Sequence, residues 1–200
     1  MTAPQLVLAS GSPRRRELLE RVGLRFAVRV PDVDEDQRPH EDPAAYVTRL
    51  AADKALAVLQ RWNDAEAGPA VVVGADTTVE LDGRCLGKPA DADDAAVMLA
   101  RLSGRTHCVL TGVAVLTTTG HTERFALRTE VRMVPLSAAA IDWYVATGEP
   151  FDKAGAYAIQ GAGGAFVAAI VGSYSNVVGL PLAETLHALQ RAGLAGVPGR

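Results

Sequence analysis

The stretch AVVVGADTTVELDGRCLGK, residues 70–88, gives the clearest indication of the fold class of this chain. It opens with a continuous apolar run, which is typical of a strand buried on both faces of a sheet. The rest predicts a hairpin, because the pair Asp82–Gly83 suits a two-residue type I′ turn. Ideal pairing places Thr77 opposite Lys88, with Asp76 one step away at the end of the buried strand. A buried strand that leads into an antiparallel hairpin indicates a mixed sheet.

Strand-like and helical segments alternate on both sides of this stretch. Apolar strand patterns cover residues 5–10, 106–118, 123–136 and 165–173. Helical spacing with start and stop signals covers residues 13–22, 43–62, 91–104, 137–148 and 180–193. Locally paired strands with interposed helices predict an α/β (mixed α+β) domain over residues 1–200. Neither a dinucleotide-binding glycine motif nor a P-loop occurs in the sequence.

Composition narrows the class of protein. The chain has 200 residues, 48% of them hydrophobic, and a formal net charge of −3. Its charges are spread along the chain, which argues against a protein that coats nucleic acid. The longest apolar runs have only strand length, so we expect no membrane segment, no export signal and a cytoplasmic location. Cys85 and Cys108 lack metal-ligand spacing, so we expect reduced, structural thiols.

Lysine is rare among the basic residues. Of 20 basic residues, only Lys54, Lys88 and Lys153 are lysine, and each is therefore a candidate for a site that needs a compact charge. Lys54 falls on the apolar stripe of the helix predicted over 43–62. By default such a lysine extends along the core edge to solvent; the alternative is an inward ammonium group that reaches a ligand.

A second candidate site lies in LASGSPRRREL, residues 8–18. Ser12 is the expected N-cap and Pro13 the first helical residue, so three arginines fall in the first helical turn. The N-terminal end of a helix already carries a partial positive charge, which disfavours arginines there. A bound anion such as a phosphate chain would neutralise these positive charges. Solvated arginines are the alternative interpretation.

The arginines of the first helical turn, the rare lysines and Asp76 together favour hydrolysis of a phosphoanhydride. Arg and Lys would neutralise phosphoryl oxygens while the carboxylate of Asp76 orients and deprotonates water. Alternatively, Asp76 is a turn cap or a partner of Lys88. RNA binding is disfavoured by the acidic balance and by the absence of an aromatic stacking platform.

Five segments carry a family resemblance. LASGSPRRREL, VVVGADTTV, LGKP, LSGRTHCVLTGVAV and DKAGAYAIQGAGG resemble the signature blocks of the Maf family. The blocks occur in the family's order, from residue 6 to about residue 181. The family consists of septum-formation-inhibitor proteins that act as nucleoside triphosphate pyrophosphatases. The resemblance implies a curved mixed sheet with two lobes around a cleft, similar to the inosine triphosphate pyrophosphatases.

The resemblance also implies residue roles. Asp76 would accept a proton, while Lys54 and Lys88 would hold phosphate oxygens. The residues that the resemblance implies for substrate binding are Ser10, Ser12, Arg14, Arg15, Thr77, Lys153 and Gln160. The form AIQG resembles the branch that acts on dTTP and UTP, with Arg14, Thr77 and Gln160 as specificity positions. Family members use a divalent cation, Mg²⁺ or Mn²⁺, and Glu35 is the candidate ligand among the four carboxylates of DVDED.

The sequence leaves a second class of function open. A nucleotide-binding regulator of division or septum formation would bind the same ligand without turnover. The apolar strands and the resemblance together favour a homodimer, and the acidic balance predicts no nucleic-acid partner. The histidines carry no predicted role, and His107, on a strand, is expected to pack or to form a hydrogen bond.

Overall fold

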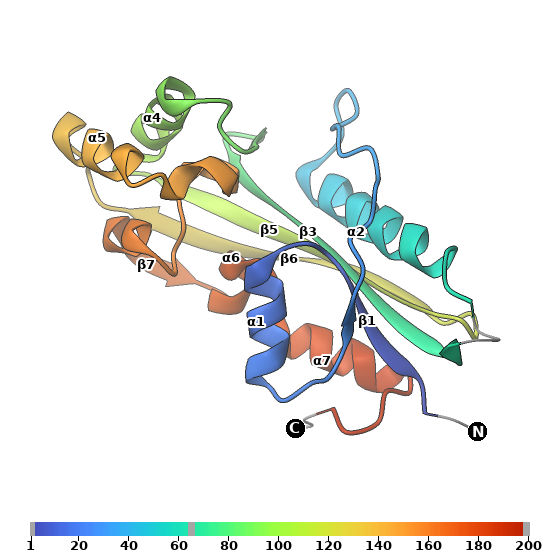
Figure 1. The fold of residues 1–200 in the computed structure, drawn as a ribbon. Helices are drawn as coiled ribbons and strands as arrows, with labels where there is room; N and C mark the ends of the chain where they lie inside the picture. The colour runs from blue at the N-terminus through green and yellow to red at the C-terminus, as the bar shows by residue number, and fades with distance from the viewer. Residues whose placement is uncertain (1–2, 64–66, 198–200) are drawn as a thin grey trace. The chain divides into compact units, whose positions relative to one another are not determined.

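The computed structural model describes residues 3–63 and 67–197 and confirms a mixed α/β fold. The chain forms two compact units. The first comprises Met1–Asp76, Thr111–Leu127 and Gly179–Arg200, and the second comprises Thr77–Leu110 and Arg128–Val178. The strands form one seven-stranded sheet in the order β2-β1-β3-β5-β6-β7, with β4 paired to β3 (Figure 1). The prediction of a single domain over residues 1–200 stays a prediction.

Three long strands run through both units, and the other elements belong to one unit each. The shared strands are β3 (Ala70–Leu81), β5 (Thr106–Thr117) and β6 (Thr122–Met133). The first unit also contains β1 (Gln5–Ala9), α1 (Pro13–Arg21), β2 (Ala27–Val28), α2 (Pro43–Leu59) and α7 (Leu182–Arg191). The second also contains β4 (Arg84–Leu86), α4 (Ala92–Leu102), α5 (Ala138–Ala146), three 3₁₀ turns, β7 (Val167–Val171) and α6 (Tyr174–Val178).

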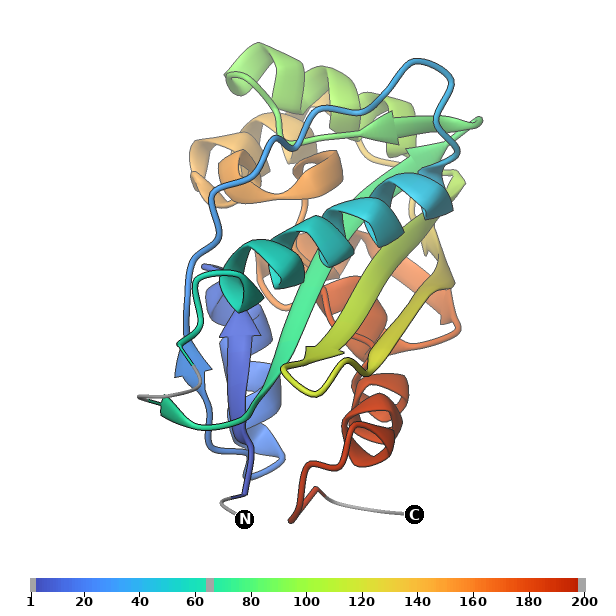
Figure 2. The ribbon, with the colours of Figure 1, turned by 90° about the vertical axis from the view of Figure 1, so that its right-hand side faces the viewer.

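In the first unit, helices cover both faces of the strands. β1 pairs in parallel with β2 and with β3. Helix α2 lies on one face of β1 and β3, while α1 and α7 lie on the opposite face (Figures 1 and 2). Strands covered on both sides must be apolar on both sides, which explains the continuous run in residues 70–75.

Helix α2 approaches β3 unusually closely at Gly74. A Cβ atom at this position would lie 2.2 Å from the carbonyl oxygen of Ala51 and 2.8 Å from the amide nitrogen of Ala55. Both atoms belong to the helix backbone, so only glycine permits this contact. Lys54 lies between these two alanines in the sequence, and Asp76 lies two residues after Gly74 on the same face of the strand.

In the second unit, β4 pairs antiparallel with β3 and β7 pairs antiparallel with β6. The pairing Val79↔Leu86 has the register expected for the hairpin, although β4 ends before Lys88. Asp82 and Gly83 have φ values of 54° and 76°, as a type I′ turn requires. Within residues 3–63 and 67–197, no helix is both long and apolar enough to cross a membrane.

Candidate active site

Lys54 is a buried cation between two carboxylates. It is only 6% exposed, which excludes the default interpretation of a lysine that reaches solvent. Its Nζ atom donates to Asp76 Oδ1 at 2.7 Å and lies 2.7 Å from Glu35 Oε1. Three segments distant in sequence therefore meet at one ammonium group: the loop before α2, the middle of α2, and β3.

Asp76 lies in the middle of β3, not at the end of a strand as the sequence predicted. The strand continues to Leu81, because the residues of the expected hairpin extend it without a break. The pairing with β1 ends earlier, at Ala9↔Gly74. Asp76 therefore lies just beyond the carboxyl end of β1, where the chain turns toward α1. It is 8% exposed.

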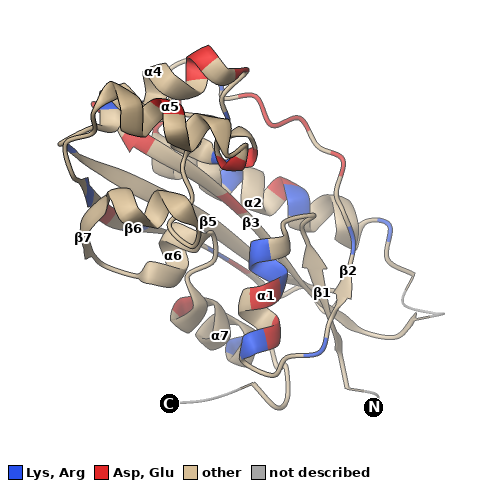
Figure 3. Ribbon diagram, turned by 60° about the vertical axis from the view of Figure 1, so that its left-hand side comes forward, with Lys and Arg blue, Asp and Glu red and all other residues tan. Residues whose placement is uncertain are grey.

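Arg15 joins the start of α1 to this end of the sheet. Its Nη1 donates to Ser10 Oγ at 3.1 Å, and its Nε donates to the carbonyl oxygen of Gly179 at 2.8 Å. The Ser10 hydroxyl also accepts from the backbone amide of Ser12 at 3.2 Å. Ser12 is the N-cap of α1, as predicted, but its side chain forms no capping hydrogen bond. The first turn of α1 therefore contains basic residues, whose backbone is coloured blue in Figure 3. The free amides at such a helix start can bind an anion.

The electrostatics of Arg15 connect it with the Lys54 cluster. Burial lowers the pKa of the Arg15 guanidinium, and the neighbouring charge of Asp76 acts in the opposite direction. Arg14 lowers this pKa further, and Glu35 raises it. Lys54, Asp76, Glu35 and Arg15 thus form one constellation of two cations and two carboxylates, which we call the Lys54 cluster.

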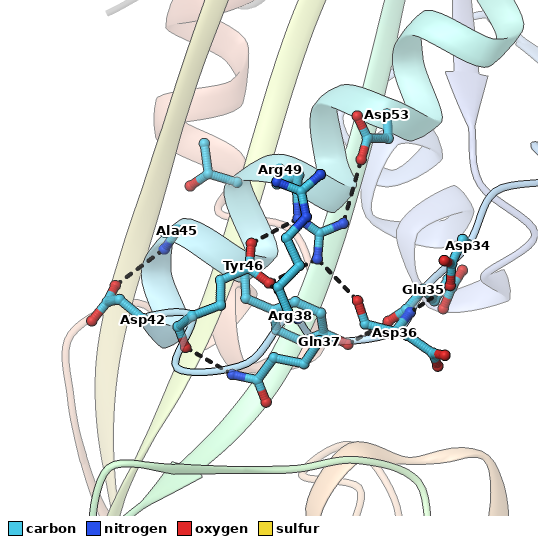
Figure 4. Close-up of polar contacts among 12 residues, drawn as sticks. Asp34, Glu35, Asp36, Gln37, Arg38, Asp42, Ala45, Tyr46, Arg49 and Asp53 are labelled. Carbon is cyan, nitrogen blue, oxygen red and sulfur yellow. Dashed lines mark hydrogen bonds and ion pairs between the residues drawn. The ribbon is translucent and has the colours of Figure 1, made fainter.

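The loop before α2 is fixed to the helix at several points (Figure 4). The Tyr46 hydroxyl donates to the carbonyl oxygen of Glu35 at 2.8 Å. Arg49 donates to both carboxylate oxygens of Glu41 at 2.7 Å and to the carbonyl oxygen of Asp36 at 3.0 Å. The hydrogen bond from Arg49 lowers the pKa of Glu41 to about 2. These contacts hold the backbone of Glu35 while its side chain stays 55% exposed.

The carboxylates of the Lys54 cluster supply too few ligands to hold a divalent cation without further oxygens. In residues 3–63 and 67–197, no group of three or more His, Cys, Asp or Glu side chains is arranged to hold a metal ion. Glu35 and Asp76 nevertheless converge on one Lys54 nitrogen. Mg²⁺ is commonly bound by one or two carboxylates together with phosphate oxygens of a substrate, so this donor set fits a cation that arrives with a phosphate ligand.

The remaining candidates, Thr77, Lys88, Lys153 and Gln160, belong to the second unit. Gly155 donates from its backbone amide to the carbonyl oxygen of Gly87 at 3.0 Å, so the loop after β4 lies beside the segment that follows Lys153. Lys153 forms an ion pair with Asp152 and donates to the backbone oxygen of Glu149 at 3.4 Å. Lys88 is exposed, and Gln160 is half-buried.

Sequence reasoning missed the residues that hold the loop before α2. Tyr46 and Arg49 lie at helical spacing on one side of α2, and this spacing is the only signal that could have identified them. Their partners Glu35, Asp36 and Glu41 lie in irregular backbone, where spacing carries no information about contacts.

His107 is buried and forms a hydrogen bond, as the sequence predicted. It belongs to the second unit, is 2% exposed, and its Nε2 lies 2.8 Å from the Tyr157 hydroxyl. Cys85 and Cys108 are free thiols, which agrees with the prediction.

A protein-family model and the relatives of known name match almost the whole chain. Residues 5–192 match the family model described as Maf-like protein. A dTTP/UTP pyrophosphatase of an Anaeromyxobacter species is 55% identical over 193 residues, covering 94% of this chain and 90% of that protein. The dTTP/UTP pyrophosphatase of Myxococcus xanthus is 54% identical over 189 residues, covering 94% and 93%.

Solved structures give a more distant match. The crystal structure of a nucleoside-triphosphatase, or dITP/XTP pyrophosphatase, from Mycobacterium abscessus aligns with a TM-score of 0.41 at 18% identity. The alignment covers 66% of this chain and 75% of that one.

Proposed function

The chain belongs to the Maf family, and on this premise we propose that it hydrolyses dTTP and UTP to the nucleoside monophosphate and pyrophosphate. The main support for this proposal is the Lys54 cluster. In this cluster the buried ammonium group of Lys54 holds Asp76 near the start of α1, where an anion can bind. Relatives that are more than half identical over almost the whole chain are named for the same activity.

The triphosphate would bind at the start of α1. Arg14 and Arg15 supply guanidinium groups, and the residues around Ser10 and Ser12 supply hydroxyl and amide donors for phosphoryl oxygens. Arg15 is already oriented by Ser10 and by the carbonyl oxygen of Gly179, so little conformational entropy is lost when an anion binds. Lys88 and Lys153 are proposed to contact further phosphate oxygens.

Asp76 is the proposed general base. It would accept a proton from a water molecule whose oxygen attacks the α-phosphorus. A bond forms between this oxygen and the α-phosphorus, while the bond to the oxygen that bridges the α and β phosphates breaks. The electron pair of the broken bond stays on the bridging oxygen, which leaves as part of pyrophosphate. Lys54 orients Asp76 through the 2.7 Å hydrogen bond and balances negative charge that accumulates on the phosphoryl oxygens.

A divalent cation, Mg²⁺ or Mn²⁺, is proposed to bind to Glu35 together with oxygens of the substrate. The cation would neutralise the charge of the triphosphate and polarise its phosphoryl groups. The exposed side chain and fixed backbone of Glu35 suit a ligand that must meet an incoming metal–nucleotide complex.

Base selection is proposed to involve Arg14, Thr77 and Gln160. The Gln160 amide offers one donor group and one acceptor, which matches the mixed donor and acceptor edge of uracil or thymine. A neutral amide is therefore suited to distinguish pyrimidines of this kind from purines.

A nucleotide panel tests this function. The purified protein is incubated with Mg²⁺ or Mn²⁺ and each of the common ribo- and deoxyribonucleoside triphosphates, and all products are identified. We expect dTTP and UTP to be cleaved preferentially, with the monophosphate and pyrophosphate as products. Release of diphosphate and phosphate, or tight UTP binding without turnover, would contradict the proposal and favour a nucleotide-binding regulator.

Two arginine variants provide a matched comparison. Arg15 is buried and hydrogen-bonded, whereas its neighbour Arg16 is exposed. Arg15→Ala should abolish most of the activity, and Arg16→Ala should leave it close to that of the wild type. Equal losses would place the triphosphate elsewhere.

A further inference from the structure

Glu149 forms a hub of hydrogen bonds in the second unit. Its Oε1 accepts from the Tyr144 hydroxyl at 2.7 Å and from the backbone amide of Gly163 at 3.1 Å. Its Oε2 accepts from the backbone amide of Ala162 at 3.0 Å. Burial opposes ionisation of this side chain, but these hydrogen bonds lower its pKa overall. One carboxylate therefore ties α5 to segment 158–164, whose last residues begin the 3₁₀ turn Ala162–Phe166.

Tyr144 forms the other half of this hub. Its side chain is fully buried in α5, and its hydroxyl accepts from the backbone amide of Ala158 at 3.0 Å while it donates to Glu149. The ring of Phe166 meets the Tyr144 ring edge to face, with centroids 5.1 Å apart. Together the two side chains hold segment 158–164 at both of its ends, at Ala158 and at Ala162–Gly163.

The glycines of the segment make this contact possible. A Cβ atom on Gly161 would lie 2.1 Å from Glu149 Oε2, and one on Gly163 would lie 2.5 Å from the Tyr144 hydroxyl oxygen. The glycines thus serve the close approach of side-chain oxygens to the backbone. The resulting hydrogen bonds fasten the segment at Ala158, Ala162 and Gly163 despite its glycine-rich composition.

Gln160 lies between the two anchored ends. Its side chain is half-buried and has no hydrogen-bond partner among the described residues. A backbone fixed on both sides of an amide that has no internal hydrogen-bond partner suits a residue that forms hydrogen bonds with a nucleobase. Selectivity between bases depends on a fixed direction of the amide donor and acceptor.

We propose that Glu149 and Tyr144 are positioning residues that set the base selectivity of the enzyme by fixing segment 158–164 and, through it, the amide of Gln160. This inference rests on the proposed function and deepens it. Neither residue needs to contact the substrate; their hydrogen bonds define where the amide can point.

Glu149→Gln and Tyr144→Phe test the proposal. In either orientation, an amide at position 149 places an NH₂ group against a backbone N–H of the segment, and phenylalanine removes the hydroxyl from both of its bonds. We expect the ratio of kcat/KM for UTP over GTP to fall about 10-fold in both variants. The change should lie mainly in KM for UTP, since the Lys54 cluster belongs to the other unit. Asp142→Asn, which removes an exposed carboxylate from the same helix, should keep the wild-type ratio.

The outcomes separate this proposal from the proposed function. A merely structural role would lower Tm and reduce the turnover of all nucleotides equally, with an unchanged ratio, and would overturn the positioning role. Absence of any turnover by the wild type would instead refute the proposed function. Equilibrium binding of non-hydrolysable UTP and GTP analogues to the same variants then still tests positioning, because loss of the UTP preference is expected and its retention would contradict it.

Discussion

The four charges of the Lys54 cluster balance one another before any substrate arrives. Lys54 and Arg15 carry the positive charges, and Asp76 and Glu35 carry the negative ones. A nucleoside triphosphate would bring several further negative charges, which this balanced group cannot neutralise alone. A divalent cation is therefore expected to arrive with the substrate, and Arg14 is expected to supply a further positive charge.

Lys54→Met should impair both stability and catalysis. Methionine fills similar volume but leaves the buried carboxylate of Asp76 without its cation. Removing one partner of a buried ion pair costs about 3 kcal/mol or more. We expect a lower Tm and a large loss of kcat, measured on the same samples by thermal melting and by pyrophosphate release.

A double variant separates the two effects. Lys54→Met combined with Asp76→Asn removes both charges of the pair, so much of the lost stability should return. Activity should not return, because neither the base nor the cation is present. Recovery of activity would contradict the role of this pair in catalysis.

At this scale the sequence predicted residue types better than contacts. The apolar stripe singled out Lys54 but favoured a lysine that extends to solvent, whereas the structure buries it. The buried run identified Asp76. The bond between them could not be read from spacing, because it depends on which face of β3 meets α2. Glu35 was one of four similar carboxylates, and only the tertiary structure directs it to Lys54.

At the scale of elements, the close packing of α2 on β3 sets the geometry of the cluster. Gly74→Ala would place a methyl group 2.2 Å from the carbonyl oxygen of Ala51, so the helix must move away from the strand. Overpacking of this kind typically costs about 1–3 kcal/mol. We expect a lower Tm and, at a temperature where the protein is folded, a clearly reduced kcat because Lys54 moves with the helix.

Gly112 provides the matched control for this prediction. A Cβ atom at Gly112 would lie 2.2 Å from the carbonyl oxygen of Val47, about two turns before Lys54 on the same helix. Gly112→Ala should therefore lower Tm similarly while affecting kcat less than Gly74→Ala. Wild-type kcat in the Gly74→Ala enzyme would show that this close approach does not position Lys54.

Helix starts and the hairpin turn were predictable because local chemistry decides them. Asp42 caps α2 through bonds to the amides of Ala44 and Ala45, and Ser137 caps α5 through Ala140. The extent of β3 was not predictable in the same way. Its twelve residues form one strand because β1, β4 and β5 pair with it along its length, which is a tertiary effect.

For the whole molecule, acid should destabilise the fold through His107. Burial lowers the pKa of this side chain to about 4, whereas an unfolded histidine has a pKa of about 6.5. The folded state thus favours neutral His107, and this contribution to stability is present above pH 6.5 and is lost as the pH falls from 6.5 to 4. Each pH unit in this window costs at most about 1.4 kcal/mol from one group.

Thermal melting between pH 4 and pH 8 checks this expectation. Tm should decline below pH 6.5 in the wild type, and the decline should be weaker in His107→Gln, whose amide does not titrate. Glu41 acts in a separate window: its pKa is lowered to about 2, so its contribution is lost only as the pH falls below about 4.5. An identical decline of Tm between pH 6.5 and pH 5 in both proteins would exclude His107 as its cause.

The fold class of the whole chain followed from its alternating pattern of strands and helices, but the strand order did not. β3 lies between β1 and β5 in the sheet, although β4 and α4 intervene in the sequence between β3 and β5. Such an order arises from long-range pairing that no local pattern encodes.

Asp76→Asn is the decisive variant for the general-base role of Asp76. Asparagine keeps the shape of the side chain but accepts a proton poorly, and Lys54 retains its contact with Glu35. The measurement is the single-turnover rate of pyrophosphate formation from UTP with saturating Mg²⁺, together with UTP affinity and Tm. We predict a rate loss of about 10²-fold or more with affinity and folding retained. A rate close to that of the wild type would contradict Asp76 as the general base.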